Sequence, residues 1–356
     1  MGEFLFEYGL FALKALTIVF FVIIGLAFFA SIFSSKQKER ESIEIEKIND
    51  HFESLQDALE SEILPKAEYK KLCKDRKKQA KKDKKAQKKQ SKGTSTTEEI
   101  KNRLFVLTFD GDMNASEVEN LRESITALLT IAKPEDEVLL LLESPGGIVH
   151  NYGLAASQLD RIKEKNINLT VAVDLVAASG GYMMACIANK IIAAPFAVVG
   201  SIGVLAQVPN FNRLLSKLDI DIEHHTAGKH KSTLTMLGKN TEDAREKFRE
   251  ELEDTHVLFK DFVKSHRPQI DIEKIATGEH WYGSTAVHLN LVDEIKTSDD
   301  YLLEKAKDTD IYQITYEIRE SFRERISTML YDSCTGLLSK IYSKITSVTA
   351  IGNWVR

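Results

Sequence analysis

Cysteine is scarce in this chain. Only three cysteines occur among 356 residues, Cys73, Cys186 and Cys334, and no two of them have the C-x-x-C spacing. This number and spacing argue against a disulfide framework and against a structural zinc site. Cys186 lies in an apolar stretch, where we expect a small core side chain. We therefore expect neither disulfide bonds nor a structural zinc ion.

A net positive charge is also lacking. The formal net charge is −5, so the chain as a whole has no positive field that would attract nucleic acid. No tandem repeat is visible either. The charged residues are unevenly distributed, and this distribution divides the chain into segments of different character.

Residues 15–35 have no charged side chain over 21 positions. A helix of that length is about 31 Å long, which is enough for the hydrocarbon core of a bilayer. A cleaved signal peptide fits less well, because Glu3, Glu7 and Lys14 precede the run and because the run exceeds the usual apolar length. Residues 1–35 are therefore predicted to be an N-terminal transmembrane anchor.

Residues 36–100 are predicted to be a charged stalk and a polybasic linker. Residues 36–65 have partly helical apolar spacing, as in a short coiled coil or an irregular helix. Residues 66–92 contain 14 basic residues against three acidic ones, and such a run does not bury a core. Anionic lipid headgroups are the favoured partner of this linker. A specific nucleic-acid site is not expected, because Tyr69 is its only aromatic residue.

Residues 101–300 alternate between strand and helix patterns. We expect strands at 103–109, 136–144, 168–177, 189–195 and 197–207. Helices are expected at 114–133, at 151–165, directly after Ser179, at 241–266 and within 276–295. This alternation predicts an α/β domain with a mainly parallel sheet and helices on its faces. Residues 301–356 are assigned to a C-terminal extension, and the pattern of residues 310–356 does not indicate its structure.

Two glycine pairs fall at predicted strand-to-helix turns. The first follows Ser144-Pro145 and consists of Gly146 and Gly147, and the second is Gly180-Gly181, directly after Ser179. Glycine allows backbone N–H groups to face a ligand closely, and the start of a helix adds a partial positive charge. Side by side, the two turns would form an oxyanion hole with the Ser179 hydroxyl as the nucleophile.

A nucleophilic serine needs a general base, and the spacing alone does not select one. Histidine is the usual base, while a lysine serves when apolar surroundings lower its pKa towards neutrality. The candidates are His150, His224, His225, His230, His280, Lys229 and Lys231.

Five motifs in a fixed order point to a known family. They are ESPGG, VAASGGYMMAC, GSIGV, TAGKHKSTLT and HWYGSTAVHLNLVDEI. Over residues 100–296 the chain resembles the signal peptide peptidase A family of membrane-bound serine proteases, and within it the SohB-type inner-membrane members. The anchor and the basic linker match that layout as well.

The resemblance implies a Ser–Lys dyad, with Ser179 as nucleophile and Lys231, not Lys229, as base. Ser201 would help to hold the lysine. The oxyanion donors would be Gly180 and one of Gly146 and Gly147, and the resemblance does not choose between these two. The resemblance implies neither a metal ion nor a cofactor. The implied fold is a Clp protease/crotonase-like α/β fold with repeated ββα-type units, in residues 101–300.

The resemblance further implies a membrane-anchored endopeptidase that cleaves unfolded or membrane-derived peptides, with cleaved signal peptides as one candidate substrate. It implies a homo-oligomer with active sites near subunit interfaces, to which neighbouring subunits contribute the serine and the lysine. The location would be the bacterial inner membrane, with a single span. The basic flank at residues 66–92 favours a cytoplasmic catalytic domain, whereas the family favours the periplasm.

Two other function classes fit parts of the pattern. A crotonase-class acyl-CoA enzyme shares the fold and the paired amides, but it has no need for Ser179 and Lys231. A non-catalytic membrane scaffold would oligomerise without cleaving, and the complete set of serine, lysine and glycines argues against it.

Overall fold

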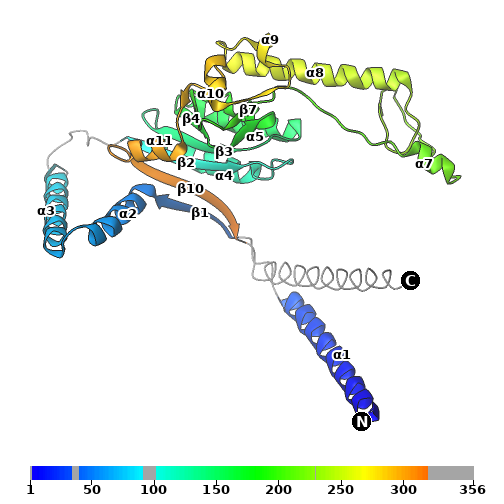
Figure 1. Cartoon of the computed structure of the whole chain (residues 1–356), viewed down its shortest axis with the longest axis horizontal. Helices are drawn as coiled ribbons and strands as arrows, with labels where there is room; N and C mark the ends of the chain where they lie inside the picture. The colour runs from blue at the N-terminus through cyan, green and yellow to red at the C-terminus, as the bar shows by residue number, and fades with distance from the viewer. Residues whose placement is uncertain (1, 34–39, 91–101, 229, 320–356) are drawn as a thin grey trace, which may run out of the picture. The chain divides into compact units, whose positions relative to one another are not determined.

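The computed structural model describes residues 2–33, 40–90, 102–228 and 230–319 (Figure 1). The chain divides into two units, one of residues 43–316 and one of residues 1–42 with 317–356. In the latter unit, helix α1 spans Gly2–Phe33. The predicted anchor, residues 15–35, runs past the described residues at its end. In the described part of the chain, no helix has the length and apolarity to cross a bilayer.

A seven-stranded sheet forms the centre of the larger unit (Figure 1). Its order is β1-β10-β2-β3-β4-β6-β9, and all neighbours from β10 to β9 are parallel. The strands are β1 (Arg40–Lys47), β2 (Arg103–Asp110), β3 (Glu137–Glu143), β4 (Asn168–Val173), β6 (Lys190–Ala193), β9 (Glu294–Ile295) and β10 (Asp310–Arg319). The prediction of an α/β domain with a mainly parallel sheet is confirmed.

Both faces of this sheet are covered, as its nearly continuous apolar strands require. In β2, Phe105 and Leu107 join the main core cluster beneath helices α4 (Val118–Leu129) and α5 (Val149–Glu164). The alternate residues Leu104 and Val106 join a second cluster with Tyr301 of α11 (Ser298–Lys305). The side chains of one strand thus alternate between two helical layers.

A smaller sheet of order β5-β7-β8 positions the chemistry. Its strands are β5 (Val176–Ala178), β7 (Val198–Gly200) and β8 (His280–Tyr282). The single strand expected at 168–177 is therefore wrong, because the chain leaves the large sheet after β4. At this break the Asp174 carboxylate accepts hydrogen bonds from the Ser298 backbone N–H, at 2.9 Å, and from its hydroxyl.

The sequence of β4, β5 and α6 (Gly180–Ala185) is a strand–strand–helix unit of the predicted kind. Likeness to the Clp protease and crotonase folds in particular remains a prediction.

The stalk and linker are more ordered than predicted. Residues 40–47 form strand β1, not a helix, because they pair with β10 at the edge of the sheet. Helices α2 (Ile48–Ile63) and α3 (Lys66–Gln90) follow. Arg76 of α3 bridges to Asp57 at 3.1 Å and to Glu60 at 2.7 Å on α2. Residues 66–90 of the polybasic run are thus helical, and none of their described side chains is buried.

Two further segments differ from expectation. Residues 276–295, expected as one helix with packed ends, contain β8, α10 (Gly283–Ala286), a 3₁₀ turn (Val287–Leu289) and β9. In the C-terminal extension, β10 joins the sheet in parallel with β2, from Asp310 opposite Arg103. The compact unit of residues 43–316 therefore extends past the predicted domain limits of 101 and 300, which stay predictions. Residues 320–356 lie outside the described residues.

The remaining helices lie in the sequence between strands β7 and β8 of the small sheet. They are α7 (Asn212–Lys217), α8 (Glu242–His266) and α9 (Ile272–Ile275). The helix expected at 241–266 is confirmed by α8, whose N-cap Thr241 accepts a hydrogen bond from the Ala244 N–H. The next residue after α8, Arg267, is buried and forms a two-pronged ion pair with Asp293 at 2.8 Å. This pair joins the end of α8 to the segment that leads into β9.

Candidate active site

Ser179 occupies the sharp turn between β5 and α6. Its backbone has φ 52° and ψ −117°, a conformation that a residue with a Cβ atom rarely adopts. The Ser179 N–H donates to the Gly200 carbonyl at 2.8 Å, and the Ser179 carbonyl accepts from the Met183 N–H at 3.0 Å. Such strain persists only where the surrounding structure enforces it, and it concentrates at functional sites. Ser179 is partly exposed, whereas all residues of α6 are buried.

The glycines after Ser179 are required by close packing. A Cβ atom on Gly180 would lie 2.4 Å from the ring of Tyr152, and one on Gly181 would lie 2.5 Å from the Ser144 carbonyl oxygen. Both distances are far below van der Waals contact. The bare backbone around the lone hydroxyl therefore allows α6 to start directly against α5 and the end of β3.

The turn after β3 lies against the Ser179 turn. Gly146 has φ 86°, and a Cβ atom there would lie 2.7 Å from the Ala178 carbonyl oxygen, the Gly180 nitrogen and the Ser179 Cβ atom. A Cβ atom on Gly147 would lie 2.1 Å from the Met113 carbonyl oxygen. The structure thus brings the two predicted glycine turns into contact.

The amide groups of these glycines differ in their partners. The Gly146 N–H donates to the Ser144 hydroxyl at 3.1 Å. For the N–H groups of Gly147 and Gly180, the described part of the chain offers no hydrogen-bond acceptor. Of the two candidates in the first turn, Gly147 is therefore the one whose amide is free to bind a ligand.

Ser201 occupies the corresponding position on the neighbouring strand. β5 and β7 are parallel with Ala178 opposite Gly200, so Ser179 and Ser201 follow two paired residues at the same edge of the small sheet. Ser201 also has a positive φ, 53°. Its N–H donates to the Glu279 carbonyl at 2.7 Å. Ser201 therefore lies beside the Ser179 turn.

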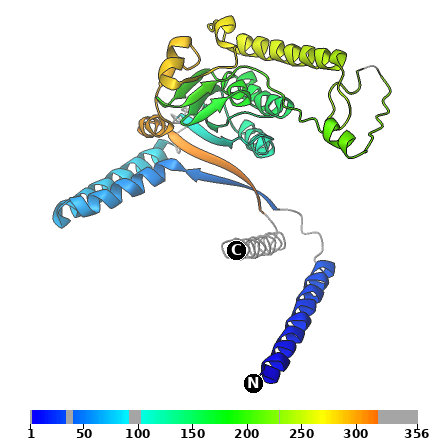
Figure 2. The same ribbon diagram turned by 45° about the vertical axis from the view of Figure 1, so that its right-hand side comes forward.

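Lys231 is not brought to this turn within one chain. It is exposed and lies in a tight turn in which its N–H donates to the Gly228 carbonyl at 3.2 Å. The segment that contains α7 extends away from both sheets (Figures 1 and 2). Among the described residues, no hydrogen bond or ion pair joins Lys231 to Ser179 or Ser201. Lys229 lies outside the described residues.

The histidine candidates lie at the surface of the described part of the chain. All five are exposed, and the His225 Nε2 atom lies 3.2 Å from a carboxylate oxygen of Glu223. No hydrogen bond among residues 102–228 and 230–319 joins a candidate histidine to Ser179. The five are His150, His224, His225, His230 and His280.

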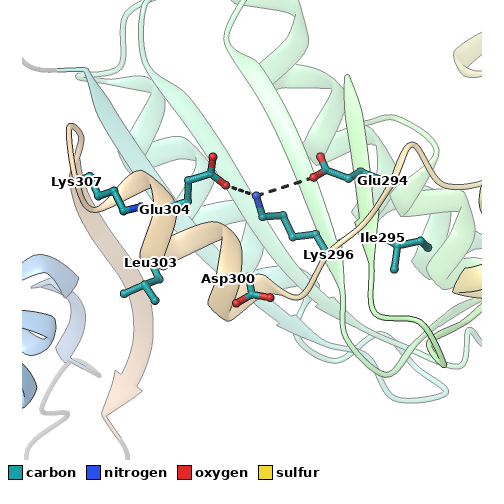
Figure 3. Close-up of a pocket in the computed structure, with 7 residues that line it drawn as sticks. All are labelled: Glu294, Ile295, Lys296, Asp300, Leu303, Glu304 and Lys307. Carbon is teal, nitrogen blue, oxygen red and sulfur yellow. Dashed lines mark hydrogen bonds and ion pairs between the residues drawn. The ribbon is translucent and has the colours of Figure 1, made fainter.

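A separate hollow lies beside α11 and β9 (Figure 3). In it Lys296 points between the carboxylates of Glu304 and Glu294, with Asp300 and Lys307 on the rim. The hollow contains none of the predicted site residues. Within the described residues, no cluster of three or more His, Cys, Asp or Glu side chains is placed to hold a metal ion.

Sequence reasoning missed the buried pair of Ser144 and Tyr152 beneath the two turns. The Ser144 hydroxyl lies 2.6 Å from the Tyr152 hydroxyl, and both residues are fully buried. A signal was present, because Tyr152 falls on the apolar face of α5 together with Ala155, Ala156 and Leu159. A phenol on a buried face needs a polar partner.

We predict opposite effects for two glycine-to-alanine changes near this site. Gly146→Ala adds a methyl group at positive φ into the Ser179 turn, so it should lower the unfolding free energy by about 2 kcal/mol or more and strongly reduce activity. Gly153→Ala is the matched control in α5, where no atom lies near the new methyl group. This change should raise the unfolding free energy by about 0.5–1 kcal/mol. Denaturant unfolding of both variants provides the measurement. Equal stabilities would contradict the packing described.

Comparison with known proteins places the chain in a family. Residues 3–159 match "Peptidase family S49 N-terminal" and residues 161–312 match "Peptidase family S49". A probable protease SohB of Haemophilus influenzae is 49% identical over 345 residues, covering 97% of this chain and 98% of that protein. A probable protease SohB of Buchnera aphidicola from Schlechtendalia chinensis is 46% identical over 304 residues, covering 85% of this chain and 100% of that protein.

Among solved structures, a membrane-bound stomatin-specific protease in complex with a substrate peptide matches with a TM-score of 0.39 and 13% identity, over 65% of this chain and 99% of that one. The sequence matches span nearly the whole chain. In the structure, the glycine turn at Gly146 lies against the turn that contains Ser179. The chain belongs to peptidase family S49.

Proposed function

We propose that this peptidase is a serine endopeptidase with Ser179 as its nucleophile. The observation that supports the proposal most directly is the backbone of Ser179, which is held at φ 52° against a second glycine turn with two unpartnered amides nearby. Ordinary packing does not require a strained, partly exposed hydroxyl at the start of a wholly buried helix. A nucleophile that must reach a peptide carbonyl requires such an exposed hydroxyl.

The proposed reaction follows the acyl-enzyme route. The Ser179 Oγ forms a bond to the substrate carbonyl carbon as its proton passes to a general base, and the N–H groups of Gly180 and Gly147 bind the oxyanion. The base returns the proton to the leaving amine as the peptide bond breaks. Water then attacks the ester, and this releases the acyl product and restores the Ser179 hydroxyl.

Lys231 is the proposed base, supplied by a neighbouring copy of the chain and supported there by Ser201. Within one chain Lys231 is exposed, and a lysine acts as a base only when burial favours its neutral form. The segment around it also exposes large apolar side chains, such as Leu205 at 81% and Leu218 at 60%. Exposed apolar surface of this kind marks a contact with another protein chain. Association of copies would bury both features at once.

The proposed substrates are unfolded or membrane-derived peptides, with cleaved signal peptides as one candidate. An extended peptide can add to the edge of the small sheet by backbone hydrogen bonds, which do not depend on substrate sequence. The family assignment supports a peptide substrate, and the finer choice rests on the resemblance of the motifs.

Attachment to the bacterial inner membrane is also proposed. The support is the uncharged run of residues 15–35, together with the basic helix α3, which can contact anionic headgroups. The catalytic unit then stays close to peptides released from the bilayer.

We predict that Ser179→Ala and Lys231→Ala each lose at least about a hundredfold in the rate of cleavage of a denatured protein by the purified full chain, because each removes a group that forms or breaks bonds. Lys229→Ala, two positions away in the sequence, should stay within about twofold of the wild-type rate. Cleavage should be followed across pH by gel and by mass spectrometry of the products. A Ser179→Ala protein that cleaves like the wild type would refute the proposed function.

A second prediction follows from the proposal that Ser179 and Lys231 of one site come from different copies of the chain. When Ser179→Ala and Lys231→Ala proteins are mixed under conditions that exchange subunits, some interfaces pair an intact serine with an intact lysine, so peptidase activity should return to a sizeable fraction of the wild-type value. Each variant incubated alone provides the control. If both groups came from one chain, the mixture would stay inactive.

The membrane proposal predicts that the full chain remains in the membrane fraction after alkaline carbonate extraction, whereas a chain without residues 1–35 is released. A reporter fused after residue 356 should be active in the cytoplasm, because the basic flank follows the span. A reporter active only in the periplasm would reverse this orientation. Release of the full chain by carbonate would contradict the anchor itself.

A further inference from the structure

A chain of hydrogen bonds runs beneath the first glycine turn. The Tyr152 hydroxyl donates to the Asp112 carbonyl at 2.7 Å. Since a phenol has one proton, the contact of 2.6 Å between the Tyr152 and Ser144 hydroxyls must be donated by Ser144. The Ser144 oxygen in turn accepts from the Gly146 N–H at 3.1 Å. The orientation of the Gly146 peptide thus depends on a phenol from α5.

The ring of the same tyrosine supports the second turn. The position of a Cβ atom on Gly180 would be 2.4 Å from the Tyr152 Cγ atom and 2.8 Å from its Cδ2 atom. The Gly180 backbone therefore packs closely against the base of the ring. The ring of Tyr152 thus contacts the Gly180 turn directly. Its hydroxyl is linked to the Gly146 turn through the Ser144 hydroxyl.

The surroundings leave this tyrosine little freedom. Tyr152 is fully buried, and its ring packs edge-to-face against Phe109 with centroids 6.3 Å apart. A Cβ atom on Gly111 would lie 2.5 Å from the Ser144 hydroxyl oxygen and 2.6 Å from that of Tyr152, so the Gly111 backbone closes over their hydrogen bond. Burial raises the pKa of Tyr152, which keeps the phenol protonated as a donor.

We infer that Tyr152 is a positioning residue for the oxyanion hole, which fixes the two glycine turns at the separation needed to bind an oxyanion between Gly180 and Gly147. This inference rests on the proposed function. Its physical basis is preorganisation, since amides held in place before the reaction need no reorganisation in the transition state. Tyr152 itself touches neither substrate nor reacting atoms, and it acts through the backbone of residues 146, 147 and 180.

The test is Tyr152→Phe in the full chain, which keeps the ring against Gly180 and removes only the hydroxyl. We expect kcat to fall about fivefold to tenfold, the worth of one hydrogen bond, with KM changed by less than about twofold. Affinity for a peptide aldehyde, whose adduct with Ser179 places an oxyanion in the hole, should fall by the same factor. Affinity for the matching peptide alcohol, which forms no adduct, should not change.

Tyr301→Phe is the matched control. It also removes a buried phenol, which hydrogen-bonds to Glu137 on the opposite face of the large sheet. Its Tm should fall comparably while kcat and aldehyde affinity stay unchanged. The inference is overturned if Tyr152→Phe keeps kcat and aldehyde affinity within about twofold of the wild type, or loses no more of either than Tyr301→Phe does.

Ser144→Ala provides a second variant should Tyr152→Phe fail to fold. It breaks the same chain of hydrogen bonds one link closer to Gly146, so the same selective loss of kcat and aldehyde affinity is expected. Unchanged values in a folded Ser144→Ala protein would also overturn the inference. Failure of the proposed function gives a different result, because Ser179→Ala would then still cleave and the aldehyde would not bind at Ser179.

Discussion

The contact between two glycine turns is the constraint on which the site depends. Gly146 and Ser179 follow different strands and are 33 positions apart in the chain, yet the Gly146 backbone packs directly against Ser179 and Gly180. No side chain other than hydrogen fits at Gly146, Gly147, Gly180 or Gly181 without displacing backbone or a buried ring. Close approach of backbones places unpartnered amides beside a hydroxyl, and this is the basis for assigning a reaction to the site.

The sheets explain how this contact is held. β3 ends at Glu143, and the next residue, Ser144, pairs as a single bridge with Ala177 of the small sheet. The Ser144 N–H donates to the Val176 carbonyl at 2.8 Å, and its carbonyl accepts from the Ala178 N–H at 3.0 Å. The backbone of Ser144 therefore ties the end of β3 to the strand that leads into Ser179. Its side chain continues the same link to α5 through Tyr152.

The proposal that two copies of the chain share one site agrees with the surfaces of the single chain. The rigid part, with Ser179, Ser201 and the glycines, lies on buried strands and turns. The proposed base lies on an exposed segment with exposed apolar side chains. This segment has its own internal order, since Asn210 donates to the carbonyls of Thr235 at 2.8 Å and Gly238 at 3.0 Å. An ordered segment with an apolar exterior fits a surface that is completed by another copy of the chain.

The sequence by itself determined the parallel α/β core, because long apolar runs alternate with amphipathic helices between residues 103 and 266, and local periodicity encodes both. It also singled out Ser179 and the glycine pairs, since small residues at strand-to-helix turns are a local signal, and the five ordered motifs indicated the family. The dyad and its oligomeric arrangement remain predictions.

Only the tertiary structure decided which distant groups meet. The break of one expected strand into β4 and β5, the entry of β1 and β10 into the sheet, and the strand at residues 280–282 depend on pairing partners far away in the chain. Two further features have the same origin: the different partners of the Gly146 and Gly147 amides, and the contacts of Tyr152 beneath both turns. Hydrogen bonds and packing between remote segments leave no periodicity in the sequence, so the fold itself was needed to reveal them.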